Sequence, residues 1–145
     1  GTACFVAGTQ VLTEYGMKNI EDIKIGEKVW AINIDTNKRE LKKVIDIFNG
    51  ITNEIYKITI GSEEITATPK HQFYITDKGW VRAAELEIGD RLGTKDTEMT
   101  IDKVEHHFLD NAIPVYNLTI DEFHTYLITK YELLVHNAAS KFKEL

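Results

Sequence analysis

The sequence predicts an all-β domain of many short strands, and three observations support that prediction. Apolar residues recur mainly with a period of two, the period at which side chains alternate across a strand. Turn signals are spread along the chain, at Tyr15-Gly16, Asn49-Gly50, Gly61-Ser62 and Lys78-Gly79. The sequence also repeats itself, so the domain is expected to contain two related halves.

The individual elements follow from local composition. Strands are expected where β-branched and aromatic residues are concentrated, because these side chains suit a pleated surface. Only two segments have the composition of short helices. In chain order, the expected elements are a helix at 18–23, a strand at 55–60, a helix at 82–86, and strands at 115–120, 126–128 and 133–135.

The repeat relates the first half of the chain to the second. Residues 13–29 (TEYGMKNIEDIKIGEKV) align with 76–92 (TDKGWVRAAELEIGDRL) at an offset of 63 residues (79 − 16), so Gly16 matches Gly79. Residues 55–60 (IYKITI) match 115–120 (VYNLTI) at an offset of 60 residues (115 − 55). The difference between the offsets fits a shorter hairpin in the second copy. The predicted fold is therefore a pseudo-twofold β structure.

Bulk composition excludes several classes of protein. A chain of 145 residues can form one domain with a hydrophobic core, and a net charge of −6 argues against a nucleic-acid-binding surface. No apolar run is long enough to span a membrane, and the first residues lack the pattern of a signal peptide. We therefore expect a monomer with neither a nucleic-acid nor a membrane partner. We expect its cellular location to be that of the larger protein in which it is embedded.

The cysteine and histidine content argues against cross-links and metals. The single cysteine, Cys4, excludes an intramolecular disulfide, and the five scattered histidines lack metal-site spacing. His106 and His107 are expected on opposite faces of a strand. No metal or other cofactor is expected.

Six polar residues are candidates for a shared site. The chain nearly ends with an apolar run that stops at His-Asn, and each half has a histidine soon after the equivalent strand. Taken singly, these are also compatible with a turn asparagine, half-exposed histidines and a buried structural cysteine. The two ends of a pseudo-symmetric domain can meet at its centre, on adjacent central strands. The candidates are Cys4, Thr68, His71, His124, His136 and Asn137.

Four sequence blocks resemble those of inteins. "CFVAGTQV" from Cys4 resembles the first intein block, and "TATPKH" resembles the block with the Thr-x-x-His signature. "YNLTIDEFHTYLI" and "LLVHN" resemble the last two. The chain is similar to the Hint family of inteins and hedgehog autoprocessing domains. It is most like a minimal bacterial intein-like domain that ends in His-Asn and lacks an endonuclease.

The resemblance implies a self-processing domain at residues 4–137, with flanks at 1–3 and 138–145. Cys4 would attack the carbonyl of Ala3 to form a thioester, with Thr68 and backbone N–H groups facing the oxyanion and His71 protonating the leaving amine. Asn137 would cyclise and break the bond to Ala138. His124 and His136 would give acid–base help to this cyclisation. The partners would be the chain's own flanks.

Two positions depart from the intein pattern. Inteins usually have Cys, Ser or Thr after the terminal Asn, where this chain has Ala138. Asn117 stands where inteins usually have an Asp, and Asn cannot act as a carboxylate, although it can form hydrogen bonds. Both departures favour cleavage over ligation of the flanks. Splicing is still possible if the freed amine of Ala138 attacks the thioester.

Two other functions fit parts of the sequence. One is an inactive β module that binds or spaces neighbouring domains, although the full set of candidate residues argues against it. The other is a thiol hydrolase that acts on other molecules through Cys4 and His71. That function leaves the His-Asn terminus unexplained.

Overall fold

The chain folds into antiparallel β structure, as the sequence predicts. The computed structural model describes residues 2–94 and 97–138, which form thirteen strands and two 3-10 helices. The elements are β1 (Phe5–Val6), β2 (Gln10–Thr13), β3 (Gly16–Asn19), η1 (Ile20–Asp22), β4 (Lys28–Asn33), β5 (Lys38–Ile60), β6 (Glu63–Ala67), β7 (Gln72–Ile75), β8 (Gly79–Arg82), η2 (Ala83–Glu85), β9 (Arg91–Thr94), β10 (Thr97–Thr100), β11 (Lys103–Ile120), β12 (Thr125–Ile128) and β13 (Leu133–His136).

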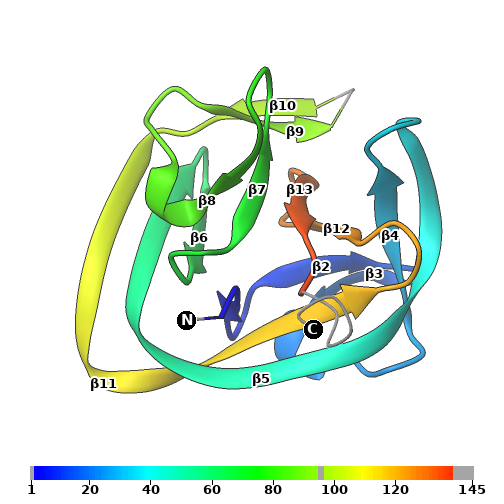
Figure 1. Cartoon of the computed structure of the whole chain (residues 1–145), viewed down its shortest axis with the longest axis horizontal. Coiled ribbons are helices and arrows are strands. Elements are labelled where there is room, and N and C mark those ends of the chain that lie inside the picture. Colours follow the sequence, from blue (N-terminus) through cyan, green and yellow to red (C-terminus); the bar gives the residue numbers. More distant parts are fainter. Residues whose placement is uncertain (1, 95–96, 139–145) are drawn as a thin grey trace, which may run out of the picture.

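Two long strands, β5 and β11, frame the molecule. They pair with each other from Lys103↔Thr59 to Ile120↔Val44 and curve together around the outside in Figure 1. The strands follow the order β10-β9-β7-β13-β12-β2-β4-β5-β11-β1-β6, with β3 paired to β2 and β8 paired to β7. In this order, β1 lies between β11 and β6, and β13 lies between β7 and β12.

The sequence repeat corresponds to a structural repeat. The hairpin of β2 and β3 is followed by η1 and then β4, and the hairpin of β7 and β8 is followed by η2 and then β9. Gly16 and Gly79 begin the second strand of the two hairpins. The predicted helices at 18–23 and 82–86 prove to be single 3-10 turns, since the second hairpin strands extend to Asn19 and Arg82.

One predicted turn is wrong. Asn49 and Gly50 lie within β5, where they pair with Tyr116 and Val115 of β11. Hydrogen bonding to the long partner strand overrides the local turn preference of Asn-Gly. Glycine suits this position of the strand because a Cβ would lie only 2.8 Å from Cε1 of Phe48, which is closer than van der Waals contact allows.

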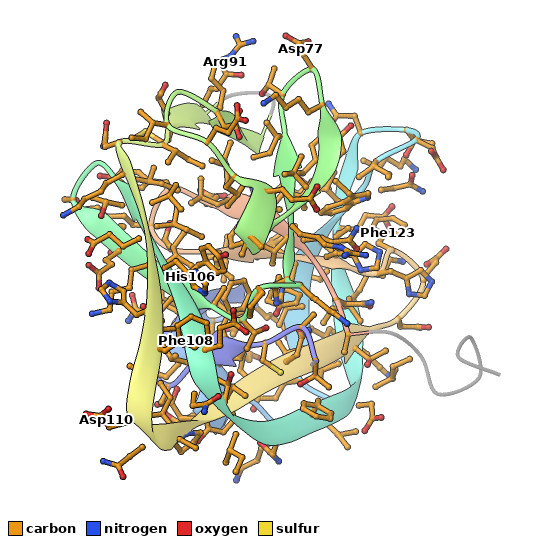
Figure 2. The ribbon with its side chains drawn as sticks, turned by 60° about the vertical axis from the view of Figure 1, so that its left-hand side comes forward. Asp77, Arg91, His106, Phe108, Asp110 and Phe123 are labelled. Carbon is orange, nitrogen blue, oxygen red and sulfur yellow. The ribbon has the colours of Figure 1, made fainter. Side chains whose placement is uncertain are left out.

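The two histidines of β11 lie on opposite faces of the strand, as predicted. The ring of His106 lies 4.8 Å from that of Phe108, and Figure 2 shows both along β11. Nε2 of His106 lies 2.8 Å from Glu54, whereas Nε2 of His107 lies 3.0 Å from Glu105. Each histidine therefore has its own carboxylate partner.

The apolar core lies directly beneath the start of the domain. The ring of Phe5 is fully buried and packs edge-on against Phe73 and Tyr126, at centroid distances of 5.8 and 6.4 Å. This packing anchors β1 and fixes the position of the preceding residue, Cys4. Among the described residues, none of the helices has the length and apolarity needed to cross a membrane.

Cys4 and Asn137 do not lie on adjacent strands, contrary to the sequence-based expectation. Cys4 immediately precedes β1, which pairs with β6 and β11. Asn137 immediately follows β13, which pairs with β7 and β12. The two ends come together because the chain leaving β13 reaches β11, where the N–H of Ala138 donates to the carbonyl of Leu118 at 2.7 Å.

Candidate active site

The peptide bond between Ala3 and Cys4 is bound by side chains on both sides. The N–H of Cys4 donates to Oγ1 of Thr68 at 2.8 Å, and the carbonyl oxygen of Ala3 accepts from Nδ2 of Asn117 at 2.7 Å. The Thr68 hydroxyl donates in turn to the carbonyl of Thr2 at 2.7 Å. These bonds hold this one peptide group by its N–H and its carbonyl.

Thr68 and His71 are held together by one turn. This turn joins β6 to β7 and is closed by the N–H of His71, which donates to the carbonyl of Thr68 at 3.2 Å. The 3-10 helix η2 secures it from outside, because N–H groups of Ala83 and Ala84 donate to the carbonyls of His71 and Pro69 at 2.8 and 3.0 Å. Backbone hydrogen bonds therefore fix the positions of Thr68 and His71 relative to each other.

His71 is a buried, neutral imidazole. Its ring lies 3.9 Å from that of Phe5, and burial lowers its pKa to about 3. Nε2 lies 3.1 Å from the carbonyl oxygen of His136, and a carbonyl only accepts, so Nε2 carries the proton. Nδ1 is buried and makes no hydrogen bond to a described residue. It is therefore a free base.

The Cys4 side chain is a buried thiol. It has no exposed surface, and its hydrogen bond to Oγ1 of Thr2 is long, at 3.8 Å. Burial raises the pKa of Cys4 to about 11, and the bond to Thr2 offsets this only in part. Because the thiolate is the nucleophile, Cys4 needs a base before it can react at neutral pH.

Asn117 is fixed in a single orientation. Its side chain is fully buried, and Oδ1 accepts from the N–H of Leu118 at 2.8 Å and from the hydroxyl of Tyr126 at 2.6 Å. A backbone N–H can only donate and a backbone carbonyl can only accept. The oxygen of the carboxamide must therefore face Leu118, and the nitrogen must face the carbonyl of Ala3.

The peptide bond between Asn137 and Ala138 is also bound from several directions. The carbonyl oxygen of Asn137 lies 2.9 Å from Nδ1 of His136, and the N–H of Ala138 donates to Leu118 at 2.7 Å. Oδ1 of Asn137 accepts from the N–H of Ile120 at 2.9 Å, while Nδ2 donates to the carbonyl of Ala138 at 2.7 Å. The Asn137 carboxamide is thus held by its oxygen, with its nitrogen directed toward Ala138.

His124 and His136 open onto the same cavity. This cavity has a volume of about 230 Å³ and is also lined by Trp80, whose ring lies edge-on to that of His136 at 4.9 Å. His124 contacts Asn137 through its backbone, since its carbonyl accepts the N–H of Asn137 at 3.0 Å. Its φ of 58° lies in the left-handed region. His136 thus contacts Asn137 through its imidazole and His124 contacts it through its backbone, and both residues line the same cavity.

A stretch of four residues in β11 contacts both peptide bonds. Asn117 binds the carbonyl of Ala3, Leu118 binds the N–H of Ala138, and Ile120 binds the side chain of Asn137. The beginning and end of the domain are thus held against one strand.

Comparison with known families agrees with this architecture. A profile of the pretoxin HINT domain family matches residues 10–138. The chain belongs to this family. The match begins after Cys4, so it covers the fold and the C-terminal junction rather than the N-terminal one.

Solved structures show the same Hint fold. The bacterial intein-like domain from Clostridium thermocellum is 39% identical, with a TM-score of 0.88, over 92% of this chain and 98% of that one. The Ssp DnaB mini-intein variant M86 is 20% identical, with a TM-score of 0.81, over 97% and 96% of the two chains. These likenesses identify the chain as a bacterial intein-like Hint domain, a class of domain that processes its own polypeptide.

A larger protein contains a related segment. The ATP-dependent DNA helicase Hel308 of Methanocaldococcus jannaschii is 32% identical over 103 residues, which span 66% of this chain and 8% of the helicase. The likeness therefore concerns a small part of that protein.

The Hint fold brings together the residues that the sequence singled out. Cys4 and Thr68 meet at the first peptide bond, and His136 meets Asn137 at the second. His71 joins the two groups through the carbonyl of His136.

One contact differs from what the resemblance implies. The resemblance places Thr68 opposite the developing oxyanion, but the side chain that contacts the carbonyl of Ala3 is Asn117. Thr68 instead accepts the N–H of Cys4.

Sequence reasoning missed three contributors to the site. Leu118 and Ile120 act through backbone groups, which leave no signal in the sequence. Tyr126 was assigned only to a strand, although a buried tyrosine hydroxyl needs a hydrogen-bond partner. The need of its buried hydroxyl for a partner could have indicated that Tyr126 contacts a polar residue of the site.

Proposed function

We propose that this Hint domain cleaves its own chain at two peptide bonds, Ala3–Cys4 and Asn137–Ala138. The observation that carries the proposal is the set of contacts from residues 117–120 to both bonds. Each bond is paired with the side chain that its cleavage requires, a thiol in Cys4 and a carboxamide in Asn137. The proposed substrate is the chain itself, so each molecule acts once, as a monomer and without a cofactor.

The first step is an N–S acyl shift. Sγ of Cys4 attacks the carbonyl carbon of Ala3, and the carbonyl electron pair moves onto its oxygen, where Asn117 donates at 2.7 Å. When the intermediate collapses, the carbon–nitrogen bond breaks and the amine of Cys4 departs. The thiol proton ends on that amine. His71 is the proposed carrier, because its free Nδ1 can take a proton and then release it.

The second step is cyclisation of Asn137. Nδ2 attacks the carbonyl carbon of the same residue, the bond to Ala138 breaks, and a proton passes from Nδ2 to the new amine of Ala138. His136 lies 2.9 Å from the carbonyl oxygen that gains charge. Nδ2 must first leave its bond to the carbonyl of Ala138. His124 is proposed to assist the proton transfer from the shared cavity.

The products follow from residue 138. Alanine offers no side-chain nucleophile, so the thioester at Cys4 has no side-chain acceptor downstream. Water then releases the upstream flank, and separate cleavage at the two ends outweighs ligation. A spliced product requires the freed amine of Ala138 to attack the thioester.

The test uses the chain with a folded reporter protein fused at each end. The purified fusion is incubated with and without a small thiol, and the products are identified by intact mass spectrometry. We expect an upstream product that ends at Ala3, a downstream product that begins at Ala138, and a domain whose Asn137 is a succinimide, lighter by one water than the hydrolysis product.

Two single variants assign the steps. Cys4→Ala should retain only the downstream cut, and Asn137→Ala should retain only the upstream cut. A parent fusion that stays intact under both conditions would overturn the proposal and favour an inactive β module. Turnover of an added peptide would instead favour a thiol hydrolase.

A further inference from the structure

Two consecutive hydrogen bonds link the carbonyl of Ala3 to a tyrosine in the core. The hydroxyl of Tyr126 donates to Oδ1 of Asn117 at 2.6 Å, and Nδ2 of the same carboxamide donates to Ala3 at 2.7 Å. Tyr126 is fully buried in β12 and pairs with Val135 of β13. These hydrogen bonds thus connect a buried residue of β12 to the first peptide bond.

We infer that Tyr126 is a positioning residue for the first cleavage step. Its hydroxyl holds the Asn117 carboxamide in the orientation that presents Nδ2 to the oxygen of Ala3. This inference rests on the proposed function, because that oxygen becomes an oxyanion only if Cys4 attacks.

Two physical effects give the hydroxyl this role. The first is geometric, because Oδ1 of Asn117 has donors on two sides, Tyr126 and Leu118, so the carboxamide cannot rotate without losing both bonds. The second is electronic, since a donor at Oδ1 polarises the carboxamide and makes its N–H groups stronger donors. The electronic effect increases as negative charge develops on the oxygen of Ala3.

The surroundings keep Tyr126 a donor throughout the reaction. Burial raises the pKa of its phenol well above the usual value, and the nearby Cys4 adds to the shift. The hydroxyl therefore stays protonated, and able to donate, around neutral pH.

The inference predicts an effect on one step only. The Asn137 side chain is bound by Ile120, and its carbonyl is bound by His136, so neither contact involves Tyr126. Removing the hydroxyl should slow cleavage at Ala3 and leave cleavage at Asn137 unchanged. The second step is thus an internal control for folding.

The experiment compares four chains in the reporter fusion: the parent, Tyr126→Phe, Asn117→Ala and the double variant. We expect a loss of upstream cleavage of about 10²-fold for Asn117→Ala, the scale of one oxyanion donor, and of roughly tenfold for Tyr126→Phe. Because Tyr126 acts through Asn117, Tyr126→Phe should add no further loss in the Asn117→Ala background.

A matched control removes a hydrogen-bonding hydroxyl elsewhere. Tyr131 contacts Oγ of Ser62 at 2.9 Å in the turn between β5 and β6. Tyr131→Phe should leave the upstream rate unchanged. A merely structural role for Tyr126 predicts equal losses at both ends and additive effects in the double variant.

A spectroscopic readout tests the geometry without any turnover. In the unreactive Cys4→Ala, Asn137→Ala chain, the side-chain NH₂ signals of Asn117 should exchange slowly with solvent. Tyr126→Phe should speed that exchange and shift those signals. The inference is overturned if the parent fusion cleaves at Ala3 and Tyr126→Phe cleaves equally fast, or if the Asn117 signals do not change. A parent that does not cleave overturns the proposed function, and with it the role of Tyr126.

Discussion

Asn117 can form a hydrogen bond that the aspartate usual at this position of inteins cannot form. Inteins resemble this chain around the position but usually have an aspartate there. In this structure the side chain donates a hydrogen bond to the carbonyl of Ala3, which an ionised aspartate cannot do. A carboxylate facing the same oxygen would repel the developing oxyanion. Asparagine therefore suits direct stabilisation of the first intermediate.

The first prediction concerns the nucleophile. Upstream release should depend on Cys4 and accelerate with added thiol, because a thioester exchanges with thiols. Cys4→Ala should abolish that release while leaving the cut at Asn137 intact. The measurement is the mass of the upstream product, with and without thiol. Release of the upstream flank from Cys4→Ala would contradict the mechanism.

The second prediction concerns pH. Burial raises the pKa of Cys4 to about 11, so Cys4 stays a thiol at about pH 7 to 9, and His71 is the proposed carrier of its proton. The upstream rate should therefore change little across that range. Burial lowers the pKa of His71 to about 3, so His71 should add no inflection near its usual value. The rate is measured in Asn137→Ala at saturating thiol. A rate that rises nearly tenfold per pH unit would mean that hydroxide from solvent, rather than His71, removes the thiol proton.

At the scale of elements, β11 is the structural link between the two ends of the domain. It pairs with β1 through Tyr116 and Val115, and its last residues bind the segment that follows β13. Its partner β5 holds it over almost its whole length. The positions of the two peptide bonds proposed to be cleaved are therefore set by pairing and hydrogen bonding with β11.

The third prediction concerns one of these turns. Gly61 links β5 to β6 with a φ of +57°, and a Cβ there would lie 2.7 Å from the hydroxyl oxygen of Tyr131. Gly61→Ala should lower the free energy of unfolding by about 1–2 kcal/mol, from left-handed backbone strain and crowding together. Urea unfolding of the unreactive chain measures this. The loss should be smaller in a Tyr131→Phe background. An equal loss would show that the Tyr131 hydroxyl does not crowd the added methyl group.

At the scale of the whole molecule, the site is built into the core rather than added to its surface. Cys4, His71 and Asn117 have no exposed surface, and Tyr126 belongs to the main apolar cluster. Burying a titratable imidazole links folding to pH, because the unfolded chain binds a proton that the folded chain excludes.

The fourth prediction follows from that link. The folded pKa of His71 is lowered to about 3 from 6.5, so the unfolded state binds more protons between these values and stability falls as the pH drops. His71 should contribute a slope of roughly 1.4 kcal/mol per pH unit near pH 5. The measurement is urea unfolding of the unreactive chain, with and without His71→Gln, from pH 6.5 to 4.5. The stability difference between the two should shrink in acid, and a constant difference would contradict the burial of a neutral His71.

The fifth prediction concerns coupling between the two ends. Ala138→Cys supplies a nucleophile beside Leu118, so the upstream segment should transfer to residue 138 before Asn137 cyclises. The ratio of ligated to free flanks, measured by mass spectrometry, should rise relative to the parent. A parent that already gives mainly ligated product would show that the amine of Ala138 attacks the thioester efficiently.

The sequence by itself determined the fold class, the repeat and the candidate residues for the proposed chemistry. Segments such as residues 115–120 predict strands because β-branched and aromatic side chains suit a pleated surface. The Hint-like order of blocks marks Cys4, Thr68, His71 and Asn137, since each reactive side chain is a property of one residue type. Such features are local and can be recognised one residue at a time.

Only the tertiary structure decided how these residues are arranged. It placed Asn49 and Gly50 inside β5, because pairing with a distant strand outweighs a local turn preference. It also assigned the contact with Ala3 to Asn117, and the support of Asn117 to Leu118 and Tyr126. Hydrogen bonds are directional and join residues far apart in the chain, and backbone donors are the same for every residue except proline. Their partners are therefore fixed by the path of β11 through the fold, which no single stretch of sequence encodes.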